Sequence, residues 1–129
     1  MAFALEVALT LVGAGLGAVL RFLMSGWINH RAGVEFPWGT LAVNVLGCFA
    51  LGFLEGAAHG DAVALFVLGR GLLAGFTTFS TLMLETMNLT RAREADRAFF
   101  NIVGSLALGI FALYVGLGLG ESVGTGTGG

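Results

Sequence analysis

The residue types best suited to chemistry are gathered in one short stretch, Gly75 to Thr81, which is led by glycine and rich in hydroxyl side chains. The stretch interrupts an apolar segment that is long enough to cross a bilayer. An unpaired backbone group is costly in hydrocarbon, so a helix that opens at this depth aims free amides and carbonyls at a bound species. The stretch therefore predicts an ion or substrate site within a broken helix.

Uncharged polar side chains lie on three of the apolar segments, both in this stretch and outside it. The set comprises Asn44, Thr77, Thr78, Ser80, Thr81, Asn101 and Ser105. Hydroxyl and amide groups donate hydrogen bonds without a fixed charge, which suits a small anion. Each of them could alternatively bond a carbonyl of a neighbouring helix. Their distribution over three segments favours a shared binding path.

The composition places the chain in a membrane, because hydrophobic residues make up 57%, charged residues make up 11%, and the mean hydropathy is +0.92. Four transmembrane helices are expected, at about Leu5 to Met24, Phe36 to Leu54, Ala62 to Leu89 and Ala98 to Gly120. The third is the helix broken between Gly75 and Thr81. The expected fold class is therefore all-α integral membrane, with one four-helix domain over residues 1–120 and a flexible tail over 121–129.

Glycine is abundant, at 22 of 129 residues. Small residues four apart let helices in lipid approach closely. Four such pairs occur, namely Gly13 with Gly17, Gly52 with Gly56, Gly71 with Gly75, and Ser105 with Gly109. Their contacts can form within the chain or between subunits, and contacts within the chain are the simpler expectation. Four helices make a thin wall around a pore, so a channel built from this chain is expected to need a dimer.

No motif indicates an enzyme. Gly13 to Ala18 loosely fits the dinucleotide pattern G-x-G-x-x-A, but the sequence lacks the alternating strands and helices that must surround it. The sequence also lacks a phosphate-binding loop and any constellation of metal ligands or of nucleophile and base. Cys48 is the only cysteine, so no intrachain disulfide can form, and we expect it to be a small packing residue.

Three motifs together resemble the Fluc (CrcB) family of fluoride channels. They are Gly13 to Ala18 with Arg21, Pro37 to Asn44, and Thr77 to Thr81 followed by Glu85. The resemblance implies four-helix subunits in the inner (plasma) membrane that pair as antiparallel homodimers. Such a dimer would form two fluoride pores along its interface and hold one structural sodium ion at its centre. The implied activity is passive export of cytoplasmic fluoride.

The resemblance also implies roles for individual residues. Asn44 matches a pore-lining asparagine, Phe79 the first of two phenylalanines whose ring edges face fluoride, and Ser105 a hydroxyl on the fourth helix. The same path would include Thr40, Ser80, Thr81, Leu82 and Asn101. Sodium would be held by the backbone carbonyls of Ala74 and Thr77 beside Gly75, with Ala74 standing where a glycine is usual.

Two positions depart from the family pattern. Leu82 stands three residues after Phe79, where a second phenylalanine is usual, and leucine has no electropositive ring edge. Either the pore tolerates an apolar wall there, or a partner subunit supplies the aromatic ring. Arg70 precedes the break and is the second departure. It either reaches a vestibule and concentrates anions or marks where the third helix meets water.

The arginines bear on how the subunits insert into the membrane. With four spans, one side would hold Arg21, Arg31, Arg91, Arg93 and Arg97, and the other side would hold Arg70. This bias predicts a fixed orientation with both termini outside. A heterodimer with an oppositely oriented, paralogous subunit is therefore the alternative to the antiparallel homodimer.

Two other functions remain open. A small proton-coupled exporter would need a carboxylate within the membrane, and Glu85 is the candidate. A pH gradient would drive such transport, whereas a channel needs none. A non-transporting assembly subunit would show the same small-residue packing, but it would not explain polar residues on three helices.

Overall fold

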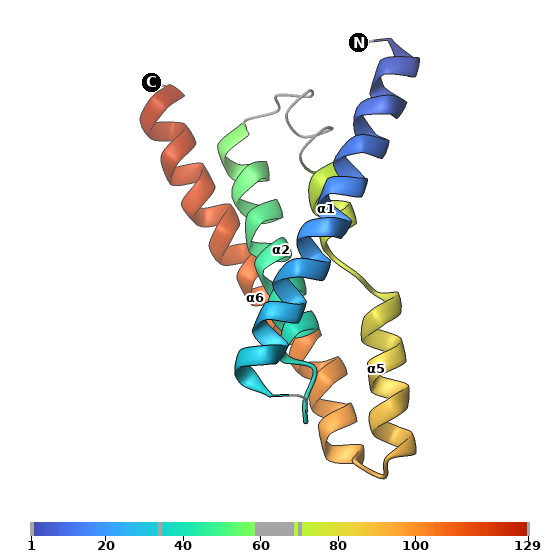
Figure 1. Cartoon of the computed structure of the whole chain (residues 1–129). Coiled ribbons are helices and arrows are strands. Elements are labelled where there is room, and N and C mark those ends of the chain that lie inside the picture. The colour runs from blue at the N-terminus through green and yellow to red at the C-terminus, as the bar shows by residue number, and fades with distance from the viewer. Residues whose placement is uncertain (1, 34, 59–68, 70, 129) are drawn as a thin grey trace.

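The computed structural model describes residues 2–33, 35–58, 69 and 71–128, which form helices joined by short turns (Figure 1). The helices are α1 (Phe3–Ala32), α2 (Trp38–Ala58), α4 (Ala74–Phe76), α5 (Ser80–Arg91) and α6 (Ala95–Gly128). Residues 69 and 71–73 are π-helical and lead into α4. The described residues contain no strand, which confirms the predicted all-α fold.

Three helices are long and apolar enough to cross a membrane, namely Phe3–Ala32, Trp38–Ala57 and Ala95–Gly124. They correspond to the first, second and fourth predicted spans. The third predicted span is divided by a break into α4 and α5, as expected. Its first part, residues 62–68, and Arg70 lie outside the described residues. Helix α6 continues past Gly120 to Gly128, and the flexibility of this tail stays a prediction.

Helices α2 and α6 form the most extensive contact in the described chain and lie side by side (Figure 1). Glycines face the opposing backbone along this contact. An added Cβ at Gly52 would overlap the carbonyl oxygen of Leu113, and one at Gly116 would overlap that of Phe49. The pair Gly52 and Gly56 therefore serves contacts within the chain, and the two helices touch through their backbones.

Helix α1 crosses the segment before the break in the same manner. A Cβ at Gly17 would overlap the carbonyl oxygen of Leu72, and a Cβ at Gly75 would overlap that of Ala14. Gly13 likewise faces the backbone of Gly71 and Leu72. These glycines hold α4 against the middle of α1, so the break that follows begins from a fixed position.

The turn between α1 and α2 is tied to both neighbouring helices. Gly33 adopts a φ of 96°, a conformation that side chains disfavour. The backbone N–H of Gly39 donates a hydrogen bond of 2.8 Å to the Asn29 side-chain oxygen. The Phe36 ring lies 5.4 Å from that of Phe100 on α6, measured between centroids. The start of α2 is thus fixed relative to α1 and α6.

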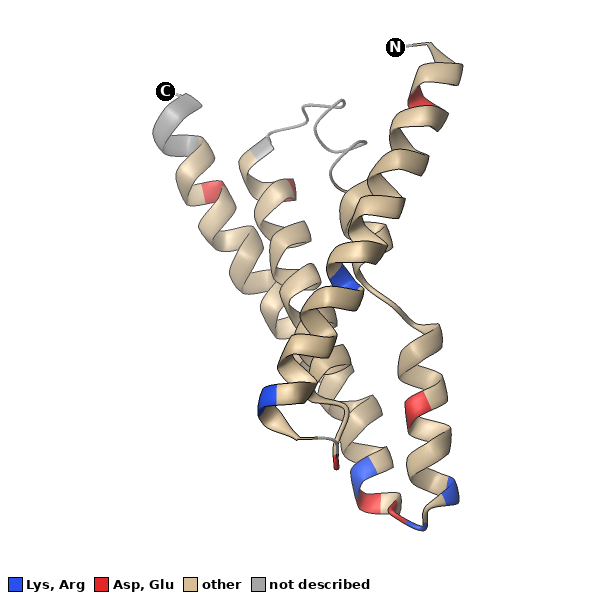
Figure 2. Cartoon of the chain, viewed as in Figure 1, with Lys and Arg blue, Asp and Glu red and all other residues tan. Residues whose placement is uncertain are grey.

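Both termini lie at the same end of the molecule (Figure 1), and most of the basic residues gather at the opposite end (Figure 2). Arg31 lies in the last turn of α1 and Arg91 in the last turn of α5. Arg93 lies in the turn between α5 and α6, and Arg97 follows at the start of α6. This end also holds Glu35, Glu94 and Asp96, and we call it the basic end because it gathers most of the arginines of the described chain.

Candidate functional site at the helix break

The break in the third span covers residues 77–79. Helix α4 ends at Phe76, and Thr77 is extended, with φ −83° and ψ 159°. Helix α5 then begins at Ser80. The predicted hydroxyl-rich interruption is therefore present, and its backbone groups need partners other than those of a continuous helix.

Asn44, in the second turn of α2, provides two of those partners. Its side-chain amide donates to the Thr78 carbonyl at 2.9 Å, and its side-chain oxygen accepts the Thr78 N–H at 2.8 Å. The amide thus replaces the helical hydrogen bonds that the break removes. An asparagine amide has two N–H groups, so one of them remains for another acceptor.

Arg21 of α1 reaches the break from the other side. Its guanidinium donates to the Thr77 carbonyl at 3.4 Å. This contact places Arg21 beside the break, whereas the sequence interpretation counted it with the arginines at one membrane face. Thr77 also carries one of the carbonyls expected to hold sodium, so this carbonyl already accepts from a cationic group.

The hydroxyl groups after the break form a local network. The Thr78 hydroxyl donates to the Thr81 hydroxyl at 3.2 Å and accepts the Thr81 backbone N–H at 3.3 Å. It also lies 3.4 Å from the Ser80 hydroxyl. This network stabilises the first turn of α5, where the backbone N–H groups lack helical partners.

A cleft of about 430 Å³ runs beside the break, between α2, α4, α5 and α6. Four predicted site residues line it, namely Asn44, Phe79, Leu82 and Ser105. The expected sodium-ligand residues Ala74 and Thr77 also line it. None of the described residues along the cleft carries a charge. The break and the fourth helix therefore bring neutral donors and an aromatic ring to one place.

Ser105 and Phe79 differ in how they meet this cleft. Ser105 is 7% exposed, and its hydroxyl has no hydrogen-bond partner among the described residues. Phe79 is 72% exposed and lies at the surface of the single chain. Leu82 is buried and occupies the wall of the cleft, where its side chain offers only apolar contact. The hydroxyl of Ser105 is thus a buried donor without an acceptor in the described part of the chain.

The remaining predicted residues lie away from this cleft. Thr40 is buried one turn before Asn44, and its hydroxyl lies close to the Glu85 carboxylate. Asn101 is fully buried and donates from its side-chain amide to the Thr86 hydroxyl at 2.9 Å. Together these contacts extend a polar track from the cleft toward the basic end.

Thr86 is a member of this track that sequence reasoning missed. Its hydroxyl also donates to the Leu82 carbonyl at 2.8 Å, one turn earlier on α5. The signal for it was its spacing of four residues from Leu82, which places both on one face of a helix. Ser80 and Thr81, by contrast, belong to the network at the start of α5 and do not line the cleft.

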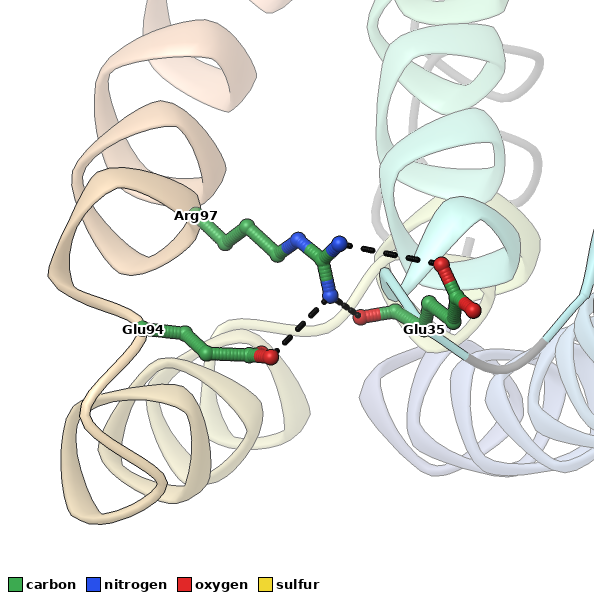
Figure 3. A network of polar contacts seen from close by, with 3 residues as sticks. All are labelled: Glu35, Glu94 and Arg97. Carbon is green, nitrogen blue, oxygen red and sulfur yellow. Dashed lines mark hydrogen bonds and ion pairs between the residues drawn. The ribbon is translucent and has the colours of Figure 1, made fainter.

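A second cleft, of about 510 Å³, opens at the basic end. Glu85 lines it together with residues of the α1–α2 and α5–α6 turns. Arg97 bridges the two turns, because one guanidinium nitrogen donates to the Glu94 carboxylate and the Glu35 carbonyl, each at 3.2 Å (Figure 3). A further contact of 3.6 Å joins Arg97 to the Glu35 carboxylate. This cleft is the mouth of the polar track.

The fold and the clefts define a class: a small multi-pass membrane protein whose interrupted helix presents uncharged hydrogen-bond donors to a cleft. The chain matches the family model described as CrcB-like protein, Camphor Resistance (CrcB), over residues 8–117, and it belongs to that family. The predicted resemblance is confirmed.

Curated relatives agree with this assignment. The chain is 69% identical over 111 residues to a protein of Rubrobacter xylanophilus named fluoride-specific ion channel FluC 1, covering 86% of this chain and 90% of the relative. It is 43% identical over 120 residues to a fluoride-specific ion channel FluC of Thermus thermophilus, covering 89% and 93%. These names describe non-enzymatic membrane proteins, in agreement with the expectations for this chain.

Proposed function

We propose that this chain forms a passive, fluoride-selective channel of the plasma membrane. The observation that carries the proposal is the buried Ser105 hydroxyl, which has no partner among the described residues and faces a cleft also lined by Asn44 and Phe79. The names of the relatives supply the ion. A channel of this kind would let fluoride leave the cell down its gradient.

The chemistry of the cleft suits fluoride. Fluoride is small and strongly hydrated, so it leaves water only where several donors replace its hydration shell. The remaining Asn44 N–H, the Ser105 hydroxyl and the electropositive edge of the Phe79 ring are such donors. Since no described residue of the cleft is cationic, binding stays weak enough for the ion to leave.

A second subunit would complete the path. Phe79 lies in the break and Ala74 begins α4 just before it, and both are exposed on the single chain. An antiparallel homodimer would cover them and form two pores along the interface. The alternative is a heterodimer with an oppositely oriented paralogue, which the concentration of arginines at one end favours. Some relatives carry numbered names, such as FluC 1 and FluC 2, as paralogues would.

Sodium would bind at the centre of that interface, through the carbonyls of Ala74 and Thr77 next to Gly75. Backbone oxygens at a break suit a hard cation. The Arg21 guanidinium, which donates to the Thr77 carbonyl at 3.4 Å, opposes a second positive charge there, so further oxygens from the partner subunit would be needed. A bound sodium ion would supply charge that holds the two subunits together. Arg21 would set the position of one of its ligands.

The test is fluoride release from liposomes that contain only this chain, measured with a fluoride electrode after addition of a potassium ionophore. Rapid fluoride release without chloride release is expected. If folded protein releases no fluoride, the same assay is repeated with an oppositely oriented paralogue. Continued failure would contradict the channel proposal and support an assembly role.

Replacing Ser105 tests the observation on which the proposal rests, the buried hydroxyl that faces the cleft. Ser105→Ala should slow fluoride release roughly tenfold, as expected for losing one hydrogen bond to a charged acceptor. Ser25→Ala is the matched control, because the Ser25 hydroxyl donates only to the Phe22 carbonyl of its own helix. Equal release rates for the two variants would remove Ser105 from the path.

A second candidate function is proton-coupled export through Glu85. One carboxylate oxygen of Glu85 is buried and has no partner among the described residues, as a proton-accepting group would require. Under this mechanism an imposed pH gradient would drive fluoride uphill, and Glu85→Gln would abolish that coupling. Transport that only follows the fluoride gradient would exclude the exporter.

A further inference from the structure

Cys48 packs against α6 and also lines the candidate path. It lies on α2 one helical turn after Asn44, and it lines the same cleft as Asn44, Phe79 and Ser105. Its side chain is partly exposed and forms no disulfide. The cysteine expected to be a small packing residue is therefore part of the wall of the candidate path.

The thiol faces the fourth helix at the next level of the cleft. A Cβ built on Gly109 would lie 3.3 Å from the Cys48 sulfur, so the thiol fills space that glycine leaves open. Gly109 follows Ser105 by four residues and lies on the same face of α6. Two successive helical turns of α2 therefore lie opposite two successive turns of α6. The first pair of turns carries Asn44 and Ser105, and the next carries Cys48 and Gly109.

A separate observation indicates that this cleft holds a ligand. The Ser105 hydroxyl, one level away from Cys48, is buried and lacks a hydrogen-bond partner among the described residues. A buried hydroxyl without a partner is costly unless a bound species accepts from it. The thiol therefore lies next to a place prepared for a hydrogen-bond acceptor.

We propose that Cys48 lines the fluoride path and is a site where thiol modification closes it. This inference rests on the proposed channel function. A neutral S–H group is a weak donor that can contact a passing anion without trapping it. A substituent on the sulfur would add volume to the cleft that Cys48 lines, because Gly109 lies against the sulfur on the α6 side.

Methyl methanethiosulfonate is a suitable probe because it is small and uncharged, so an electrostatic barrier does not exclude it. The Cys48 thiol loses its proton to the buffer, and its sulfur attacks the methylthio sulfur of the reagent. A new S–S bond forms, the bond to the sulfonyl sulfur breaks, and methanesulfinate leaves with the electron pair. The product is a methyl disulfide on Cys48.

The experiment measures fluoride release from liposomes before and after treatment with this reagent, with modification followed by mass spectrometry of the intact protein. Treated wild-type protein should release fluoride at least roughly tenfold more slowly, because a narrow path tolerates little added volume. Reduction with dithiothreitol should restore the original rate, which separates a block from unfolding. Cys48→Ala and Cys48→Ser should each keep their own untreated rate after treatment.

A relocated cysteine provides the matched control. Ala107 is exposed on α6, two residues after Ser105, and does not line the cleft. The double variant Cys48→Ala with Ala107→Cys should gain the methylthio group and show no change in release. A block in this variant would contradict a specific role for Cys48.

The outcomes separate the two proposals. No fluoride release from untreated wild-type protein would contradict the channel function, and the Cys48 proposal with it. Release that continues unchanged after complete modification would contradict the Cys48 proposal alone. A wild-type thiol that fails to react would also contradict it, since a residue on the path must be accessible.

Discussion

The contact between α2 and α6 and the surroundings of α5 are built from different interactions. Along α2 and α6, glycines bring backbone against backbone, as at Gly52 and Gly116. The break and helix α5 are instead joined to their neighbours through single polar groups, Asn44 pairing with Thr78 in the break and Asn101 with Thr86 on α5. The first arrangement depends on shape, and the second depends on hydrogen bonds.

This difference follows from the solvent. Lipid is as apolar as a leucine side chain, so helices in a membrane associate through close packing more than through hydrophobic burial. Backbone contact therefore makes a rigid frame. A path for an ion needs the opposite property, because polar groups there must accept and release a transient partner. The chain places its backbone contacts in the frame and its polar contacts at the break, where the proposed path lies.

The largest predicted effect is a loss of folding when the frame is overfilled. Gly116→Ala adds a Cβ that overlaps the Phe49 carbonyl oxygen, so α2 and α6 must separate. We expect a cost of about 3 kcal/mol or more, because the overlap is with backbone atoms that cannot rotate away. It should be seen as a lower thermal midpoint in detergent and less monodisperse protein.

Gly118→Ala is the control for this prediction, because nothing lies within 4 Å of the Cβ it would add on the same helix. Alanine is also the better helix former, so this control should keep or raise the midpoint. If both variants melt at the same temperature, the backbone contact between α2 and α6 does not support the fold.

The second prediction concerns the polar pairing at the break. Asn44→Ala removes both partners of the Thr78 backbone, at a cost of about 1 to 3 kcal/mol in all because the cleft beside them leaves room for other partners. Fluoride release should fall more than the thermal midpoint does, because the substitution also removes the free N–H of the path. Parallel measurements of release and thermal unfolding check this expectation. Normal release from a destabilised protein would show that Asn44 only holds the break.

The sequence predicts most of the frame for physical reasons. Long uncharged runs must be helices in lipid, and small residues four apart indicate where those helices approach. Spacing does not reveal which helix a glycine meets. Gly13 and Gly17 meet the segment before the break, whereas Gly52 meets α6, and only the three-dimensional path of the chain decides this.

The candidate site was predictable in its residue types and less so in its partners. An uncharged amide or hydroxyl in an apolar helix must bond something, so Asn44, Asn101 and Ser105 were recognisable. Their actual partners are the Thr78 backbone, the Thr86 hydroxyl and, among the described residues, none for the Ser105 hydroxyl. Arg21 shows the limit best, because a charge near a helix end in sequence lies beside the break in space.

The smallest predicted effect is at the basic end, where interactions are exposed. Arg97 contacts Glu35 and Glu94, but its side chain is 42% exposed and that of Glu35 is 85% exposed. Exposed ion pairs contribute about 0 to 1 kcal/mol and weaken in salt, so Arg97→Ala should lower the thermal midpoint only slightly.

The measurement compares midpoints at low and high salt, with Arg91→Ala as the control because Arg91 forms no ion pair among the described residues. If Arg97→Ala destabilised the protein as much as Asn44→Ala, the turns at the mouth of the track would belong to the fixed frame, and the division between frame and path would have to be redrawn.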